Sequence, residues 1–177
     1  RLPRGPGRAQ GRALAALLGR GPALGEGEER ILRRRDNGQW QIEKPMNWPA
    51  NFYIVNQVLN QIQFLTKEYS FTVESSLKKG KTLGDYGLQE PRLELALGWG
   101  GRKHTVAFGQ PTEMGGKTYL LGPERRNIYA VSQQLEASLL QKLEFWRSQE
   151  IFTLSVIEVG SISLDINDSG NLTKIRL

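Results

Sequence analysis

The feature of this sequence that most constrains its fold is a series of four short runs in which apolar and polar side chains alternate. They occupy residues 92–97, 103–108, 118–121 and 127–131, and each of the connections between them contains glycine. Alternation with a period of two puts successive side chains on opposite faces of a β-strand. The runs therefore predict an antiparallel meander with one buried face and one wetter face.

A hairpin is predicted ahead of this meander. Residues 31–35 and 39–44 flank Asp36-Asn37-Gly38, whose residue types tolerate the positive φ that tight hairpin turns require. Pro45 ends the second run, because proline removes a backbone donor from a strand.

Two helices are expected to pack on the sheet. Pro49 suits the first turn of a helix, and Asn47 is the candidate N-cap. Apolar residues then follow at helical spacing, namely Phe52, Val55, Leu59, Ile62 and Leu65. A second helix is expected from a similar series, Leu135, Leu139, Leu143 and Trp146.

Two shorter elements are predicted between the first helix and the meander. Residues 69–74 favour a short strand, with Phe71 and Val73 on one face. Residues 83–88 favour a helical turn that ends at Gly87 in the left-handed conformation.

The chain divides into three segments by composition and pattern. Residues 1–27 are rich in arginine, glycine, proline and alanine, which predicts a disordered basic extension. Residues 28–158 are expected to form one α+β domain, an antiparallel meandering sheet with two packed helices. Residues 159–177 predict a last hairpin around residues 167–170, and its turn echoes Asp36-Asn37-Gly38. This echo motivates the hypothesis that the domain is the first copy of a tandem repeat, with a truncated second copy beginning near Val159.

Charge and cysteine content narrow the classes of function. The net charge is +6, and five arginines precede the first acidic residue, Glu26, so the basicity belongs to the extension rather than to the domain. A phosphate-binding fold would carry its basic face on the folded part, so nucleic acid is not the expected partner.

The absence of cysteine excludes disulfides and thiolate ligands. The longest apolar run near the start, residues 13–18, is too short to span a bilayer, so a membrane is expected only through an anchor outside this chain.

Several short motifs in a fixed order resemble those of a known family. They are Gly38-Gln39-Trp40-Gln41-Ile42-Glu43-Lys44-Pro45, the Pro49-Ala50 helix start, Tyr86-Gly87-Leu88-Gln89-Glu90-Pro91, Val106-Ala107-Phe108-Gly109, Ile128-Tyr129-Ala130-Val131 and Phe145-Trp146-Arg147-Ser148. Together they resemble the bacterial domain of unknown function family numbered 4340, over about residues 29–177. The tyrosine-glycine-leucine-x-x-proline segment is the most distinctive of them.

The resemblance implies a location and a class of partner. Proteins of this family are usually associated with the cell envelope, often with an amino-terminal membrane anchor and the domain outside the cytoplasm. They tend to be encoded beside components of ABC transporters of the gliding-motility type. The resemblance brings no established enzymatic activity and no catalytic residues. The chain departs from the pattern at its start, where the anchor and the first strand are expected.

Histidine and carboxylate chemistry find little support in the sequence. His104 is the only histidine, and it lies in a predicted strand near Val106 and Phe108, which favours a structural role. A zinc site needs three or four ligands, and one imidazole without thiolates does not provide them. The carboxylates are scattered over turns and strand surfaces, and no spacing pairs any two of them for acid–base work, namely Glu90, Glu94, Glu113, Glu124, Asp165 and Asp168.

The predicted hairpin tip at Gly98-Trp99-Gly100-Gly101 is the most distinctive surface feature. No phosphate-loop lysine or following helix accompanies these glycines. Trp99, flanked by Arg102 and Lys103, either packs onto the domain or anchors a partner, since tryptophan is enriched among binding hot spots. The three residues are the candidate partner-binding site.

The sequence therefore predicts a binding module rather than an enzyme, with no cofactor, no metal and no catalytic residues. The favoured hypothesis is a non-catalytic envelope module that docks onto a protein partner in an ABC-transporter-type assembly. A glycan-binding domain that uses the Trp99 tip is the first alternative. A carboxylate-dependent hydrolase is the second.

Overall fold

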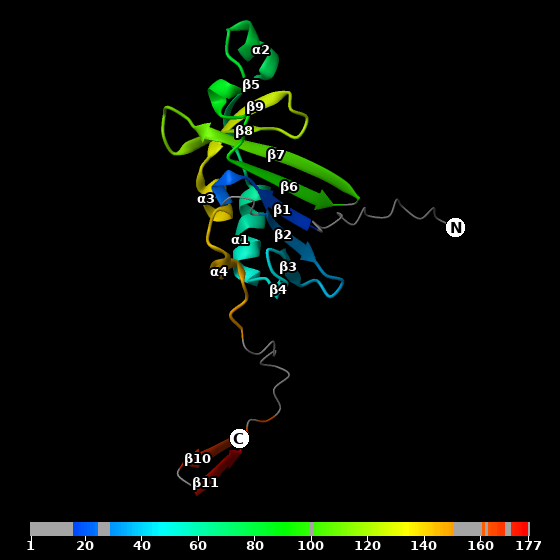
Figure 1. The fold of residues 1–177 in the computed structure, drawn as a ribbon, viewed down its shortest axis with the longest axis vertical. Helices are drawn as coiled ribbons and strands as arrows, with labels where there is room; N and C mark the ends of the chain where they lie inside the picture. The colour runs from blue at the N-terminus through cyan, green and yellow to red at the C-terminus, as the bar shows by residue number, and fades with distance from the viewer. Residues whose placement is uncertain are drawn as a thin grey trace, which may run out of the picture.

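The computed structural model describes residues 16–24, 29–99, 101–150, 161, 163–168 and 171–176. Its main body is a nine-stranded antiparallel sheet with short helices (Figure 1), and a separate two-stranded sheet follows. The α+β class predicted from the sequence is confirmed. The strands are β1 Ala16–Arg20, β2 Glu29–Arg34, β3 Trp40–Lys44, β4 Trp48–Pro49, β5 Lys67–Thr72, β6 Leu93–Trp99, β7 Arg102–Pro111, β8 Lys117–Leu121, β9 Asn127–Ser132, β10 Ser163–Asp168 and β11 Asn171–Arg176. The helices are α1 Phe52–Gln63, α2 Val73–Lys78, α3 Gln134–Leu139 and α4 Leu143–Trp146, and 3-10 turns lie at Pro22–Leu24 and Gly84–Tyr86.

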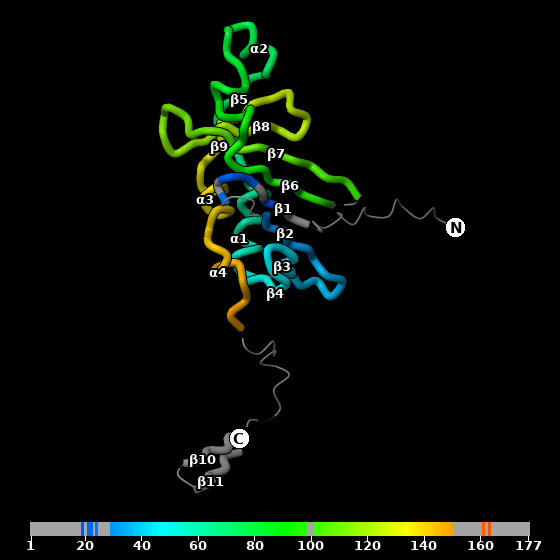
Figure 2. Tube along the Cα trace, viewed as in Figure 1, coloured from blue at the N-terminus to red at the C-terminus, as the bar shows by residue number. Residues whose placement is uncertain are grey.

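The predicted meander is the continuous middle of the large sheet. The strand order is β4-β3-β2-β1-β6-β7-β8-β9-β5, so β6 to β9 are neighbours in chain order. The hairpin of β2 and β3 is also confirmed, and Gly38 in its turn has φ 83°. Figure 2 follows the path of the chain from this hairpin through α1 and up to β5 at the far edge of the sheet.

One part of the predicted extension is wrong. Residues 16–20 form β1, which lies between β2 and β6 and pairs antiparallel with both. The 3-10 turn at Pro22–Leu24 follows it. The boundary predicted at residue 27 is therefore too late, because an alanine- and leucine-rich strand is stabilised by its two neighbours rather than by intrinsic propensity. Residues 1–15 lie outside the described residues.

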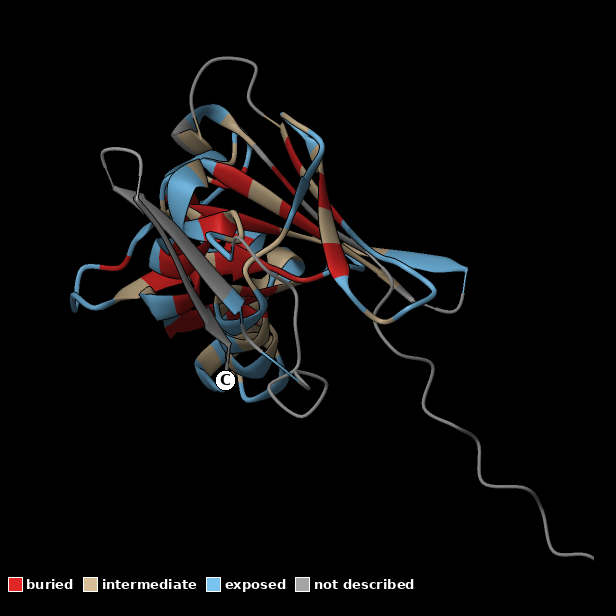
Figure 3. Cartoon of the chain, turned by 90° about the horizontal axis from the view of Figure 1, so that it is seen from below, coloured by how far each residue is buried: buried red, intermediate tan, exposed pale blue. Residues whose placement is uncertain are grey.

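The larger core lies between one face of the sheet and helices α1, α3 and α4. It includes fully buried side chains from both layers, and the interior positions form a continuous buried zone in Figure 3. The largest of them is Trp146 in α4, which is 0% exposed. The buried members are Leu32, Trp40, Ile42, Val55, Val58, Leu93, Leu95, Phe108, Leu120, Val131, Leu135, Leu139 and Trp146.

Helix α1 begins later than predicted. Pro49 belongs to β4, and the N-cap is Asn51 rather than Asn47. The Asn51 side-chain oxygen accepts hydrogen bonds from the backbone N–H groups of Tyr53 and Ile54, at 3.0 and 3.4 Å. The sequence contains two candidate N-caps, Asn47 and Asn51. Because Trp48 and Pro49 after Asn47 pair with β3 as strand β4, the helix begins after Asn51.

Replacing Asn51 with alanine is expected to lower the free energy of unfolding by about 1 kcal/mol, the usual loss for an asparagine N-cap. Asn47→Ala is the matched control, because Asn47 only accepts an exposed hydrogen bond from Gln41. Urea unfolding curves of the two variants and the parent chain measure both changes. An equal loss in the two variants would contradict the assignment of the cap.

The predicted second helix is divided in two. Helix α3 ends at Leu139 and α4 begins at Leu143, and Lys142 between them has an extended ψ of 152°. Leu135, Leu139 and Trp146 are nevertheless buried as their spacing predicts. Both short helices therefore contribute apolar residues to the same core.

A second, smaller core lies on the opposite face of the sheet. Its buried members come from the Tyr86-Gly87-Leu88 segment and from strands β7 to β9, namely Tyr86, Leu88, Ala107, Leu121 and Ile128. Gly87 ends the 3-10 turn with φ 65°, so the predicted left-handed cap is confirmed. The hydroxyl of Tyr86 lies 2.7 Å from that of Ser76 in α2, which ties this helix to the cluster.

Two further predictions are adjusted by the structure. The strand predicted at residues 69–74 begins at Lys67 and ends at Thr72, and Val73 starts α2. The last hairpin is confirmed in β10 and β11, with Asp168 opposite Asn171 across a two-residue connection. The β2–β3 turn instead closes at Arg34 opposite Trp40, so the two turns differ in length. The tandem repeat stays a prediction, and Val159 lies outside the described residues.

Candidate interaction surfaces

A groove opens beside the start of α1 and is called the α1 groove below. Two backbone hydrogen bonds build it by holding residues 146–148 along the β4–α1 connection. The Asn51 N–H donates to the Trp146 carbonyl and the Ser148 N–H donates to the Pro49 carbonyl, both at 2.8 Å, and together they make Ala50 and Arg147 an isolated antiparallel bridge. The groove has a volume of about 570 Å³ and is lined by Gln39, Trp40, Gln41, Pro49, Ala50, Asn51, Phe52, Tyr53, Ser148, Gln149 and Glu150.

Exposed aromatic rings stand at the rim of the α1 groove. Phe52 is 65% exposed and Tyr53 is 75% exposed, and their rings meet edge to face with centroids 5.7 Å apart. Trp48 nearby is 40% exposed, and its indole N–H donates to the Ser148 carbonyl at 3.0 Å. The guanidinium of Arg147 lies 5.1 Å from the Trp48 ring centroid. The sequence-based assignment of Phe52 to the core is wrong.

The polar groups of the α1 groove are mainly carboxamides. Gln39, Gln41, Asn51 and Gln149 contribute them, and Glu150 is the one charged residue in the described lining. The Asn51 side chain caps the helix, which fixes the floor of the groove. The arrangement can offer aromatic ring faces together with hydrogen-bond donors and acceptors, with little electrostatic selection for a charged ligand.

The tip of the β6–β7 hairpin carries the partner-binding residues predicted from the sequence. Trp99 is paired with Arg102 across the tip, and Arg102 and Lys103 are exposed. The side chain of Trp99 and residue 100 lie outside the described residues. Strand β7 pairs with β6 from Arg102 onward, but its pairing with β8 starts only at Ala107. The two strands therefore project past β8 as a ribbon (Figure 1).

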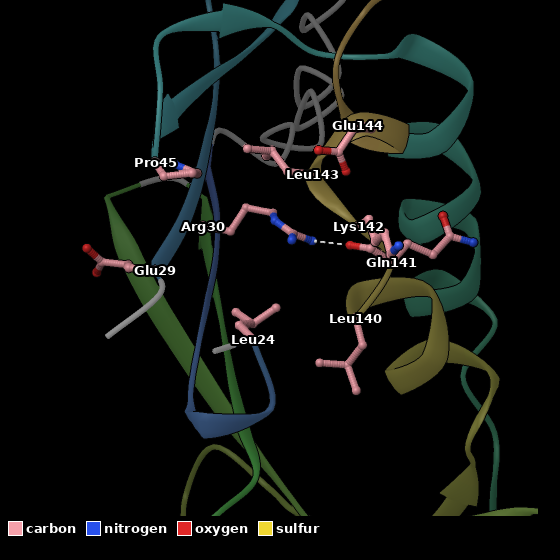
Figure 4. A pocket seen from close by; sticks show the side chains of 9 residues that line it. All are labelled: Leu24, Glu29, Arg30, Pro45, Leu140, Gln141, Lys142, Leu143 and Glu144. Atoms are coloured by element: carbon pink, nitrogen blue, oxygen red, sulfur yellow. Dashed lines mark hydrogen bonds between the residues drawn. The ribbon is translucent and has the colours of Figure 1, made fainter. Parts of the chain in front are cut away.

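A second cavity, of about 360 Å³, lies between β2 and the break that separates α3 from α4 (Figure 4). The guanidinium of Arg30 reaches across it and donates from Nη1 to the carbonyls of Leu139 and Gln141, at 2.9 and 3.0 Å. It also lies 5.2 Å from the ring centroid of Trp146. Arg30 is only 7% exposed, and its donors serve the carbonyls that the end of α3 leaves without helical partners. We therefore assign this cavity a structural role, because Arg30 connects β2 to the end of α3 there.

The remaining sequence candidates lie apart from these surfaces. His104 is half-buried in β7 opposite Leu97. Within the residues that the structure describes, no group of three or more histidine, aspartate or glutamate side chains could hold a metal ion. Sequence reasoning missed Glu136, which is 4% exposed and lies 3.4 Å from Arg92 Nη1. The sequence signal that could have identified Glu136 is a single acidic residue next to the apolar positions of the predicted helix.

Tyr119, which packs against the second core, has a shifted pKa. Burial, followed by the hydrogen bond with Tyr69, raises the pKa of Tyr119 to about 12. Its ring packs edge to face on Tyr86, with centroids 4.9 Å apart. Tyr119 is therefore a neutral packing residue at physiological pH.

Comparison with known proteins identifies the family. The model of a domain of unknown function, DUF4340, matches residues 40–176, and the chain belongs to this family. The matched range includes the β6–β7 tip, the β10–β11 hairpin and every residue that lines the α1 groove except Gln39. No curated protein and no solved structure matches the chain significantly. No helix among the described residues is long and apolar enough to cross a membrane.

Proposed function

We propose that this member of the DUF4340 family is a non-catalytic interaction module on the extracytoplasmic face of the bacterial envelope, accessory to an ABC-transporter-type assembly. Membership of the family supports the proposal, because the association with transporter genes and the envelope is what the sequence resemblance implies. The β6–β7 tip supplies the docking element.

The observation that carries the proposal is the edge of β7 at Arg102 and Lys103, which no strand among the described residues pairs with on the β8 side. Residues 102–106 precede the first pair that β7 forms with β8, so this stretch of strand is not covered by β8. A strand edge of this kind is a template for pairing with a segment of another protein. Arg102 and Lys103 are both exposed there, and their charges prevent unselective edge pairing while favouring an acidic partner.

Charge reversal at the tip tests the proposal. The double variant R102E/K103E is expected to reduce recovery of the transporter permease and ATPase with the affinity-tagged protein at least about tenfold, because like charges across an interface disfavour binding by more than 1.4 kcal/mol. The measurement is quantitative co-purification from solubilised envelopes of the source bacterium. Lys79→Glu, an exposed lysine beyond the end of α2, is the matched control.

Two results would count against docking at the tip. One is equal recovery of the transporter subunits by the parent chain and the double variant. The other is a loss as large in Lys79→Glu, which would indicate a nonspecific effect of net charge. A urea unfolding curve of the double variant establishes that the fold is retained.

A glycan-binding function is the second candidate, and the α1 groove rather than the Trp99 tip is the feature that favours it. Exposed aromatic rings beside carboxamides are suited to sugars. The carboxylate-dependent hydrolase stays a prediction without a described site, and an assay for release of reducing ends from polysaccharides would detect it.

A further inference from the structure

We infer that the α1 groove is a binding site for a neutral oligosaccharide. The inference does not depend on transporter docking, because the groove lies at β3, β4 and α1, whereas the proposed docking element is the tip of β6 and β7. A module can bind a glycan at one place and a protein at the other.

The first step of the argument is the cost of leaving the rim aromatics in water. Phe52 and Tyr53 occupy the first turn of α1, and the Asn51 cap fixes the backbone of that turn. Both rings are more than half exposed although the next two turns of the helix contain buried positions for apolar residues, at Val55 and Val58. Large aromatic side chains that remain exposed beside a groove indicate a binding site, whereas single exposed apolar residues elsewhere on the surface do not.

The second step is the geometry of the rings. Phe52 and Tyr53 meet at an interplanar angle of 81°, so their ring faces point in nearly perpendicular directions. The faces can pack against the apolar C–H faces of sugar rings, while the Tyr53 hydroxyl keeps a polar end in water. Trp48 is a third partly exposed ring held by its hydrogen bond to Ser148.

The third step is the chemistry of the lining. Carboxamides both donate and accept hydrogen bonds, as sugar hydroxyls do, and four line the groove, from Gln39, Gln41, Asn51 and Gln149. The Asn51 oxygen is engaged by the helix cap, the Gln39 oxygen accepts from Asn37 and the Gln41 nitrogen donates to Asn47, so the other polar atoms of these amides and Gln149 remain for a ligand. The described lining holds no lysine or arginine, and the neighbouring guanidinium of Arg147 lies over the Trp48 ring, 5.1 Å from its centroid, rather than among the lining residues. Glu150 adds an acceptor for hydroxyl groups. The lining thus selects a neutral polyhydroxylated ligand over a charged one.

The volume fits a short segment of chain. About 570 Å³ lies within the range of roughly 300–1,000 Å³ that is typical of small-ligand sites, so the groove accommodates an oligosaccharide segment rather than a single hydroxyl group or an ion.

The test is isothermal titration calorimetry of the 177-residue chain with three neutral tetrasaccharides. Their units are β-1,4-linked glucose, β-1,4-linked N-acetylglucosamine and α-1,4-linked glucose. Tryptophan fluorescence is recorded in parallel. Saturable binding to at least one is expected. Phe52→Ala and Tyr53→Ala are each expected to weaken it about tenfold, the loss of an aromatic hot spot. Phe64→Ala is the control, because Phe64 is 72% exposed immediately after the other end of α1 and lines a separate cavity of about 370 Å³ with Asn60 and Gln61. Its affinity is expected to match that of the parent chain if the α1 groove is the binding site.

Several outcomes would overturn the inference. They are no saturable binding of any tetrasaccharide by the parent chain, equal affinity in the parent and both groove variants, or an equal loss in Phe64→Ala. Tighter binding of an anionic tetrasaccharide of galacturonic acid would overturn the neutral selectivity. Saturable binding of a glutamine-rich peptide that is lost in Tyr53→Ala, without any sugar binding, would assign the groove to a polypeptide instead. Recovery of transporter subunits by Tyr53→Ala stays at the parent level if docking occurs at the tip, so the two ideas fail separately.

Discussion

Replacing Gly109 with alanine is expected to lower the free energy of unfolding by about 4 kcal/mol, a loss at the extreme of single substitutions. A Cβ atom at this position would lie 2.1 Å from the carbonyl oxygen of Tyr86 and 3.0 Å from the side chain of Leu88. The first neighbour is backbone, so it cannot rotate away. The strand and the 3-10 turn would have to separate, which would open the second core at Tyr86 and Leu88.

Two other glycines separate steric overlap from backbone strain. Gly115 has φ 68°, and a Cβ atom added there would meet nothing within 4 Å, so Gly115→Ala isolates the conformational cost, about 1 kcal/mol. Gly87 combines φ 65° with a Cβ position 2.8 Å from the Gln110 backbone nitrogen, so Gly87→Ala is expected to approach the loss at Gly109. Urea unfolding followed by tryptophan fluorescence gives all three values. A loss at Gly109 no larger than that at Gly115 would contradict the close approach.

Gly87 and Gly109 give a physical reason for the family motifs. The Tyr86–Pro91 segment and the Val106–Gly109 segment were separate short matches in the sequence. In the structure they lie against each other, with Gly87 beside Gln110 and Gly109 beside Tyr86. Each glycine permits the approach of the other segment, and Tyr86 fills the second core that results.

Elements with a strong local signal were predictable from the sequence. The turn at Asp36-Asn37-Gly38 and the alternation over residues 92–131 depend on residue type and on a period of two, and both give the observed strands. The left-handed Gly87 was predictable for the same reason. Strand β1 was not, because Ala16–Arg20 resembles the composition of the residues before it and is stabilised by pairing with strands on both sides.

The candidate sites show the same limit. Helical periodicity placed Phe52 in the core, but periodicity does not say where a helix starts or whether its first turn reaches past the sheet. The α1 groove is formed by residues 147–150 returning to Pro49 and Ala50, a contact between segments about a hundred residues apart. No local pattern encodes that contact. The β6–β7 tip, by contrast, follows directly from two alternating runs joined by glycines.

Removing the Arg30 side chain is the second substitution with a large expected effect. Arg30→Ala is expected to lower the free energy of unfolding by about 3 kcal/mol, because one buried and one partly buried carbonyl lose a charged donor and a cavity is left beside Trp146. The contact lies at the break that divides α3 from α4. The Leu139 and Gln141 carbonyls lie at the break, where the helix itself provides no further N–H groups for them.

Arg30→Lys distinguishes the geometry of the guanidinium from its charge. Lysine keeps the charge, but its compact ammonium lacks the planar guanidinium that donates to both carbonyls from Nη1 and lies 5.2 Å from the Trp146 ring centroid. It is therefore expected to recover less than half of the loss in Arg30→Ala. Arg33→Ala is the control, because Arg33 forms an exposed ion pair with Glu43 and is expected to cost at most about 1 kcal/mol. Urea unfolding measures stability, and the emission maximum of the tryptophans reports whether Trp146 becomes hydrated. If Arg30→Lys kept the full stability of the parent chain, the positive charge would be sufficient, and the planar guanidinium would not be needed to connect β2 to the α3–α4 connection.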